Sequence, residues 1–226
     1  MLTSGLYKMS HGLQKEFERI DLLGQNLANA GTPGFRAVLF GERGKGSLDR
    51  WIGGETPAPT LTERALDVCP PPGDAFCVSG PEGTVRYTRR GDLRVDDSGT
   101  LVVGSGEPIL STTGAPITIE PRRPFEIDRS GRVVQGGKPL GTLARVSVDR
   151  PMRSGGSSVF DAPEGEEPSA STQPIEVGQL DSSDVNLEGD TTRLAATLAR
   201  ARLFQTFARA QDETVEQAIR DLGSSR

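Results

Sequence analysis

Two cysteines and one histidine are the side chains of this sequence that are most able to take part in chemical reactions. Cys69 and Cys77 lie eight positions apart around three prolines, which allows a local disulfide or two buried thiols. Two cysteines are too few for a disulfide framework, so free thiols are the favoured interpretation. His11 has no serine or cysteine partner placed by a catalytic motif, so we expect it to be a packed or solvent-edge side chain.

A glycine-rich stretch and three aspartates complete the list of candidates. Residues 41–47 contain three glycines but lack the spacing of a phosphate-binding loop, so a plain loop is expected there. Asp96, Asp97 and Asp128 come shortly before Ser-Gly pairs, a pattern typical of turns in which aspartate bonds its own backbone. The sequence thus predicts no catalytic residue, no cofactor and no metal site, and hence no enzyme.

Composition narrows the function further. The chain has 226 residues, a net charge of −5, 28 glycines, 16 prolines and a single histidine. The acidic balance argues against a nucleic-acid partner, and so many turn formers exclude an all-helical fold. The chain lacks an uninterrupted apolar run of the length that a transmembrane helix needs, so no membrane insertion is expected. Charged residues interrupt the first 23 positions, which predicts export without a cleaved signal peptide, or no export.

Both ends of the chain have helical periodicity. Residues 2–30 repeat apolar side chains every seven positions, with Glu16 as the one exception in the companion row, and glycine and proline at 31–34 end the pattern. A second pattern runs from Leu187 to 222, with a cap expected at Asp190 or Thr191. The side chains expected to form the helical contact surface are Leu6, Leu13, Ile20, Leu27, Leu194, Leu198, Ala201, Phe204, Ala208, Val215 and Leu222.

These apolar stripes must be covered, because each exposed leucine forgoes roughly 1.5–3 kcal/mol of burial. Chain ends usually lie close together, so the two helices can pair in a coiled-coil-like manner. Two interpretations are about equally favoured by the pattern. In the first, a subunit completes its helical core on assembly. In the second, the helices of a monomer fold back on a β domain.

The centre of the chain, residues 35–178, has the alternation and turn signals of a hairpin-built β domain. Residues 93–102 and 125–134 resemble each other at a spacing of 32, and each copy predicts a strand, a tight turn and a strand. Residues 154–174 are polar, acidic and proline-rich, which predicts a flexible loop without a core. The expected fold is mixed and mainly β, with residues 1–34 and 179–226 forming a helical inner domain.

The segment from Asn26 to Ala37 reads Asn-Leu-Ala-Asn-Ala-Gly-Thr-Pro-Gly-Phe-Arg-Ala. It resembles the N-terminal signature of the flagellar rod and hook protein family, in which an amphipathic helix ends in an asparagine block before a turn. The motif residues are Asn26, Asn29, Pro33, Gly34 and Phe35. Polar side chains can bond the carbonyls freed at a helix end, Pro-Gly turns the chain, and the phenylalanine packs onto the next element.

The resemblance continues along the chain. Residues 64–68, 87–102 and 178–186 are similar to the family's β-domain entry, its Tyr-Thr-Arg hairpin and the block that opens its last helix. Residues 70–77 depart from the family pattern and keep only Phe76. The short length and residues 198–204 are most similar to the proximal rod protein of the family.

The resemblance implies a structural subunit of the flagellar basal-body rod, which crosses the periplasm. Such subunits polymerise through their terminal helices into a torque-transmitting shaft and are exported uncleaved. The implied partners are copies of the chain, other rod subunits and the flagellar type III export apparatus. A distal rod or hook subunit, or a soluble β-domain scaffold or binding module, remain the alternatives.

Overall fold

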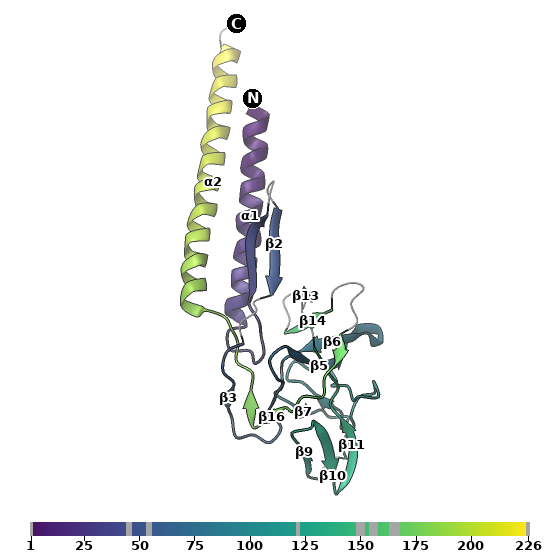
Figure 1. The fold of residues 1–226 in the computed structure, drawn as a ribbon. Coiled ribbons are helices and arrows are strands. Elements are labelled where there is room, and N and C mark those ends of the chain that lie inside the picture. The colour runs from purple at the N-terminus through teal and green to yellow at the C-terminus, as the bar shows by residue number, and fades with distance from the viewer. Residues whose placement is uncertain are drawn as a thin grey trace. The chain divides into compact units, whose positions relative to one another are not determined.

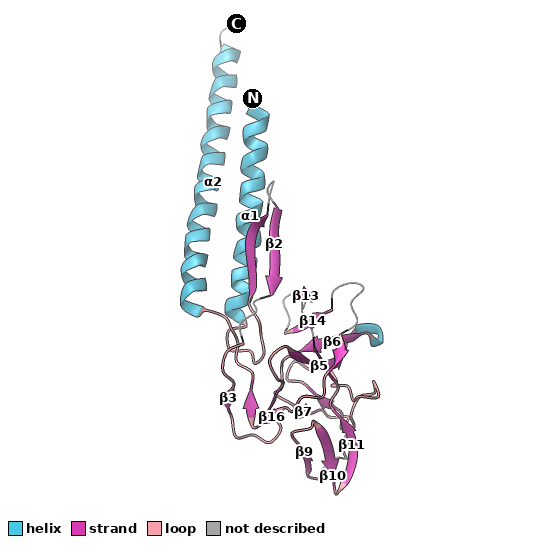
Figure 2. Ribbon diagram, viewed as in Figure 1, coloured by secondary structure: helices cyan, strands magenta, loops and turns pink. Residues whose placement is uncertain are grey.

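A computed structural model describes residues 2–43, 47–52, 56–120, 123–147, 152–153, 158–162 and 168–224 (Figure 1). The architecture is mainly β, with one helix near each end of the chain (Figure 2). The helices and strands are α1 (Leu2–Ala28), β1 (Val38–Arg43), β2 (Ser47–Ile52), β3 (Thr60–Leu61), β4 (Val68–Cys69), β5 (Asp74–Ser79), the 3-10 helix η1 (Pro81–Gly83), β6 (Val85–Thr88), β7 (Arg94–Val95), β8 (Leu101–Val102), β9 (Phe125–Ile127), β10 (Arg132–Gln135), β11 (Lys138–Thr142), β12 (Arg145–Ser147), β13 (Met152–Arg153), β14 (Val159–Asp161), β15 (Ser169–Ala170), β16 (Glu176–Val177), β17 (Gln179–Leu180) and α2 (Leu187–Ser224).

The chain forms two compact units. The helical unit contains residues 1–28, 40–49 and 186–226, and the β unit contains residues 29–39 and 50–185. The predicted inner domain has other bounds, since 29–34 and 179–185 belong to the β unit here. The predicted bounds describe how the chain divides by function, and they stay a prediction.

In the helical unit, α1 and α2 contact each other over much of their length, and Figure 1 shows them running side by side. As residue number rises along α1 it falls along α2, which makes the pair antiparallel. Gly12 lies against Phe204, and Asn26 is hydrogen-bonded to Asp190. The β1-β2 hairpin contributes residues 40–49 to the same unit. The periodicity therefore predicted both helices correctly, including the end of α1 before the Gly-Pro-Gly segment.

The β unit is built from antiparallel pairs. Its largest sheet has six strands in the order β13-β14-β6-β5-β12-β15, and a three-stranded sheet has the order β11-β10-β9. Two-stranded ladders join β16 to β4, β17 to β3 and β7 to β8. Side chains from these sheets meet in one buried core, which consists of Val68, Phe76, Val78, Leu93, Leu101, Val103, Ile109, Ile117, Ile119, Ile127, Val133, Leu143, Val159 and Ile175.

The two predicted hairpins are confirmed, and they share a register. Val95 pairs with Leu101 in β7-β8, and Ile127 pairs with Val133 in β9-β10. These pairs occupy equivalent positions in the two copies of the repeat. A repeated sequence therefore produces a repeated pairing, because the turn sets the register of a short hairpin.

The turns of the two hairpins are also equivalent. Asp96 accepts hydrogen bonds from the backbone N–H groups of Ser98 (2.9 Å) and Thr100 (2.8 Å). Asp128 accepts the same pair of bonds from Ser130 (2.9 Å) and Arg132 (3.1 Å). Both carboxylates thus hold a turn, as their position before Ser-Gly indicated, and they form no acid–base pair with each other.

The segment 154–174 is a partial correction. Residues 154–157 and 163–167 lie outside the described residues, but Val159–Asp161 forms β14 and Ser169–Ala170 forms β15 within the six-stranded sheet. Val159 and Phe160 are buried. The composition of the segment concealed two apolar residues that pair with β6 and enter the core, so these parts are not a loop without a core.

The start of the second helix is a further correction. Asn186 accepts a hydrogen bond from the backbone N–H of Gly189 (2.8 Å), so α2 begins at Leu187 and its cap is Asn186. Asp190, the predicted cap, lies buried in the first turn and is bonded to Asn26 on α1. Within the predicted last segment, Gln179–Leu180 forms a strand, β17.

Candidate functional site

The surface where α1 meets α2 is the first candidate site for a protein whose sequence predicts assembly. Gly12 lets the ring of Phe204 approach closely, because a Cβ on Gly12 would lie 3.1 Å from the ring carbon Cζ. At the other end of the pair, the amide of Asn26 donates to the Asp190 carboxylate at 3.4 Å. The helices are therefore joined by a close packing contact and by a polar contact.

The predicted contact residues differ in their burial. Ala201 is buried, and Leu198 and Val215 are 39% and 40% exposed. The side chains of Leu6 and Leu222 lie outside the described residues. The half-buried members are Leu13, Ile20, Leu27, Leu194, Phe204 and Ala208. Most of the described stripe is thus at least partly covered within one copy of the chain.

The most buried part of α1 differs from the predicted stripe. Among the side chains of α1 whose burial is described, from Ser10 onward, the buried ones are Glu16, Leu22, Leu23 and Asn26. They follow one another at spacings of one to six positions, so the predicted period of seven follows the margin of the buried face. Asn26 was predicted to close the helix end, and its bond to α2 was not foreseen.

Glu16 is the exception in the heptad pattern, and it is nevertheless buried. Its Oε1 accepts a hydrogen bond from Arg19 at 2.8 Å and lies 4.0 Å from Nη1 of Arg200 on α2. A buried carboxylate is costly unless cations neutralise it. Glu16 is therefore an ionic contact inside the helix pair, and its position could have been flagged by the single break in the apolar row.

A second apolar row on α2 points away from α1. Leu203 is 58% exposed and Phe207 is 63% exposed. Ala196, Ala199 and Ala210 continue the row and are exposed as well. The sequence signalled only that small residues allow close neighbours, and burial in the structure distinguishes this outer row from the inner one.

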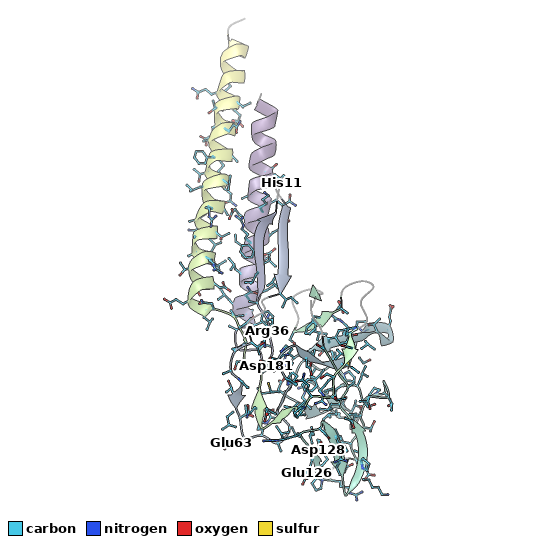
Figure 3. All side chains as sticks on the ribbon, viewed as in Figure 1. His11, Arg36, Glu63, Glu126, Asp128 and Asp181 are labelled. Atoms are coloured by element: carbon cyan, nitrogen blue, oxygen red, sulfur yellow. The ribbon has the colours of Figure 1, made fainter. Side chains whose placement is uncertain are left out.

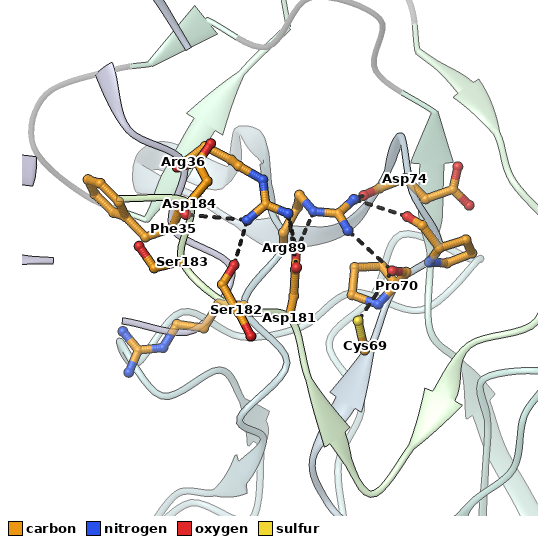
Figure 4. A network of polar contacts seen from close by, with 12 residues as sticks. Phe35, Arg36, Cys69, Pro70, Asp74, Arg89, Asp181, Ser182, Ser183 and Asp184 are labelled. Atoms are coloured by element: carbon orange, nitrogen blue, oxygen red, sulfur yellow. Dashed lines mark hydrogen bonds and ion pairs between the residues drawn. The ribbon is translucent and has the colours of Figure 1, made fainter. Parts of the chain in front are cut away.

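The β unit contains a buried network centred on one carboxylate (Figure 4). Arg36 donates two hydrogen bonds to Asp181, at 2.9 and 2.7 Å, and Arg89 donates a third at 2.5 Å. Arg36 precedes β1 and Asp181 follows β17, so the network joins the segment that follows α1 in sequence to the segment that precedes α2. All three side chains are more than nine-tenths buried.

Backbone carbonyls accept further hydrogen bonds from both arginines. Arg36 donates to the carbonyl of Ser182 at 2.8 Å. Arg89 donates to the carbonyls of Pro70 (3.2 Å), Pro71 (3.0 Å) and Asp74. The three carbonyls bonded to Arg89 lie in the segment 70–77, which departs from the family pattern, so its three prolines do not prevent a defined local structure. The arrangement is suited to fixing chain segments and not to chemistry.

The motif residues lie beside this network. Gly34 has a φ of +66°, and a Cβ there would collide with the backbone carbonyl of Arg89. Only glycine therefore fits. The N–H of Gly34 donates to the carbonyl of Asp181 at 2.7 Å, and Phe35 is fully buried. Pro33 is half-buried, and Asn29 accepts a hydrogen bond from the Thr32 hydroxyl at 3.2 Å.

Comparison with known proteins accounts for this combination of elements. Residues 73–135 match the flagellar hook protein FlgE/F/G D1 domain. The chain is 30% identical to the flagellar basal-body rod protein FlgF of Mesorhizobium japonicum, covering 91% of this chain and 92% of the relative. This chain belongs to the flagellar rod and hook protein family. Within the family it is FlgF-like, since a second FlgF, that of Rhizobium meliloti, is 26% identical over the full length of both chains.

Another rod protein of the family is similar to almost the same extent. The flagellar basal-body rod protein FlgG of Bacillus subtilis is 25% identical, covering 95% of this chain and 97% of the relative. The relatives are structural rod and hook proteins and not enzymes. The chain is accordingly a structural flagellar protein, and the assembly surfaces of the rod and hook family are the functional sites to seek in it.

The surroundings of the two cysteines and the histidine fit a structural protein. Cys69 and Cys77 are buried free thiols, as favoured from the sequence, and burial raises the pKa of each to about 11, with Asp181 adding to the rise at Cys69. His11 lies exposed on α1 (Figure 3). Across the described ranges, no cluster of side chains could hold a metal ion, and neither helix is long and apolar enough to cross a membrane. Residues 44–46 of the glycine-rich stretch are outside the described residues.

Proposed function

We propose that this protein is a subunit of the flagellar basal-body rod that polymerises through its terminal helices. The observation that carries the proposal is the outer row of α2, where Leu203 and Phe207 are each more than half exposed while α1 and α2 already cover each other's inner faces. Exposed aromatic and aliphatic side chains in a row are typical of protein–protein interfaces. The helical unit is therefore a building element that neighbours complete.

The mechanical role follows from the nature of such contacts. Interdigitated helices from many copies form a shaft that transmits torque, and head-to-tail contacts continue along it instead of closing. Copies of the chain and other rod subunits are the proposed partners, and the rod crossing the periplasm is the proposed location. The family resemblance further supports uncleaved export through the flagellar type III apparatus, and a coiled-coil-like pairing of α1 with α2.

The proposal is tested in cells with a variant in which side chains of the outer row are substituted. In a strain that lacks the native gene, wild-type chain should restore swimming and complete basal bodies, whereas Leu203→Asp with Phe207→Asp should not. Leu61→Asp with Leu140→Asp is the matched control, because these leucines of the β unit are also exposed. Intact basal bodies and normal swimming with the helix variant, at normal protein levels, would contradict the proposal and favour a soluble scaffold.

A distal rod or hook subunit is the second candidate, because the similarity to FlgG spans nearly the whole chain. Gold labelling of the chain in isolated basal bodies distinguishes the two positions. Label on the proximal part of the rod supports the FlgF-like assignment, and label only at its distal end or on the hook supports the second candidate.

A further inference from the structure

Charges are segregated along α2. Between residues 191 and 211 the charged side chains are four arginines, with no carboxylate and no lysine. The next five residues, 212–216, carry three carboxylates, of which Glu213 and Glu216 are exposed. One helix therefore presents a basic segment followed by an acidic segment. The arginines are Arg193, Arg200, Arg202 and Arg209.

The basic segment surrounds the outer apolar row. That row repeats at spacings of three and four positions, which places its members on one face of the helix. Arg193 and Arg200 follow one margin of the row at a spacing of seven, and Arg202 and Arg209 follow the other margin at the same spacing. Among described residues, the row consists of Thr192, Ala196, Ala199, Leu203, Phe207, Ala210 and Thr214, all of them exposed.

A hollow borders the row on the side of Phe204. A shallow cavity of about 390 Å³ is lined by Phe204, Phe207, Ala210, Gln211 and Thr214. Its lining is mainly apolar, and it lies where the basic segment ends. A side chain of a neighbouring helix would fit such a hollow as a knob fits a hole.

The acidic segment has an uncovered apolar side of its own. Val215 continues the inner stripe of Ala201 and Ala208 at a spacing of seven, but it is 40% exposed. Gly12 of α1 lies against Phe204, and from there residue number falls along α1 as it rises along α2. The start of α1 at Leu2 is therefore opposite about residue 214 of α2, next to Val215.

We propose that the acidic segment of α2, residues 212–216, docks on the arginine-flanked outer row of α2 in a second copy of the chain. This inference rests on the proposed rod function and specifies its contact. The centre of the acidic segment lies about 13 residues beyond the centre of the basic segment, residues 191–211, which corresponds to a parallel stagger of about 20 Å at about 1.5 Å per residue. The same contact can then repeat from copy to copy, so the assembly remains open.

Charge complementarity selects this occupant. An arginine-flanked apolar row attracts a helix with exposed carboxylates beside an apolar side chain, and the 212–216 segment has both. Glu216 pairs with Arg220 at 3.0 Å, but both side chains are more than two-thirds exposed. Such a surface ion pair is weak, so Glu216 can exchange it for an arginine of the neighbour.

Two complementary charge-reversal variants of the full chain test the proposal. The row variant carries Arg202→Glu and Arg209→Glu, and the tail variant carries Glu213→Arg and Glu216→Arg. In each variant the two reversed side chains meet charges of their own sign on the partner's segment, so each alone should assemble at roughly tenfold higher concentration than wild type or not at all. A mixture should assemble again, because every row then meets a tail of opposite charge. Sedimentation velocity at low salt measures the size of the particles.

The matched control reverses two exposed arginines of the β unit, with Arg94→Glu and Arg129→Glu, and should assemble as wild type does. Circular dichroism shows whether each variant keeps its helices. The proposal is overturned by variants that assemble like the control, by a mixture that stays monomeric, by wild type that fails to associate at low salt, or by a mixture whose particles stop at dimers. A dimer limit would indicate an antiparallel, closed contact.

Failure of this contact is separable from failure of the rod function. If gene deletion abolishes basal bodies while the mixture stays monomeric, the chain is a rod subunit with another contact. If deletion leaves basal bodies intact, the rod function itself is wrong.

Discussion

The β unit and the helical unit bury their side chains to different extents. Fourteen apolar residues form one core in the β unit, and its central buried carboxylate, Asp181, meets two arginines. In the helical unit, Leu203 and Phe207 are more than half exposed, although α1 and α2 contact each other along their length. The β unit therefore buries its apolar core within a single chain, whereas the helical unit leaves part of its apolar surface exposed, which supports the proposed assembly.

The largest effect is expected at the buried network of the β unit. Asp181→Ala leaves Arg36 and Arg89 buried without their carboxylate, which should lower the free energy of unfolding by about 3–5 kcal/mol. Urea denaturation followed by circular dichroism measures this change. Asp161→Ala, which removes a partly exposed partner of Arg86, should cost about 1 kcal/mol or less. Equal losses in the two variants would show that the buried network contributes no more stability than a partly exposed ion pair.

Substituting one phenylalanine in each unit tests the difference between the units directly. Phe76 is fully buried in the β core, and Phe207 is 63% exposed on α2. Phe76→Ala should destabilise the isolated chain by about 3–5 kcal/mol through a cavity. Phe207→Ala should change its stability by less than about 0.5 kcal/mol and should weaken self-association instead. A large loss of monomer stability for Phe207→Ala would mean that this face is covered within one copy.

Hydrogen exchange of the dilute monomer tests the same difference between the helical unit and the β unit. Amides of residues 192–220 should exchange at least about a hundredfold faster than those of residues 85–103, because the helices open without unfolding the β core. Assembly at low salt should slow exchange in 192–220. Equal protection of both ranges in the monomer would favour a rigid scaffold over an incomplete subunit.

The smallest effect concerns pH and the hairpin turns. Hydrogen bonds from Ser130 and Arg132 lower the pKa of Asp128 to about 2, below the ordinary 3.8. A depressed carboxyl pKa stabilises the fold fully above the unfolded value, and this contribution is lost as the pH falls from about 4 through about 2. The group is exposed, so the contribution is well below about 1 kcal/mol. Carboxyl resonances in a magnetic resonance titration should show Asp128 titrating below the ordinary 3.8 of an aspartate, and titration at that ordinary value would contradict the turn contacts.

Local pattern was sufficient for several features. The Asp-x-Ser-Gly repeats predicted both hairpins, because turn chemistry and strand alternation act over short stretches of chain. Apolar periodicity predicted both helices, since covering one face requires a repeat near 3.6. The motif of Asn26 to Phe35 indicated the family, and the structure shows why Gly34 is needed at its left-handed backbone position.

Tertiary structure alone decided the rest. Val159 and Phe160 lie in a polar segment, and their burial depends on a partner strand, β6, that is distant in the sequence. Glu16 is buried in the helix pair, 4.0 Å from Arg200 of the other helix, and Arg36, Arg89 and Asp181 meet although each comes from a different part of the chain. The amino-acid sequence determined which faces are apolar, through local periodicity. The tertiary structure decided which of those faces are covered, because burial depends on contacts between residues that are far apart along the chain.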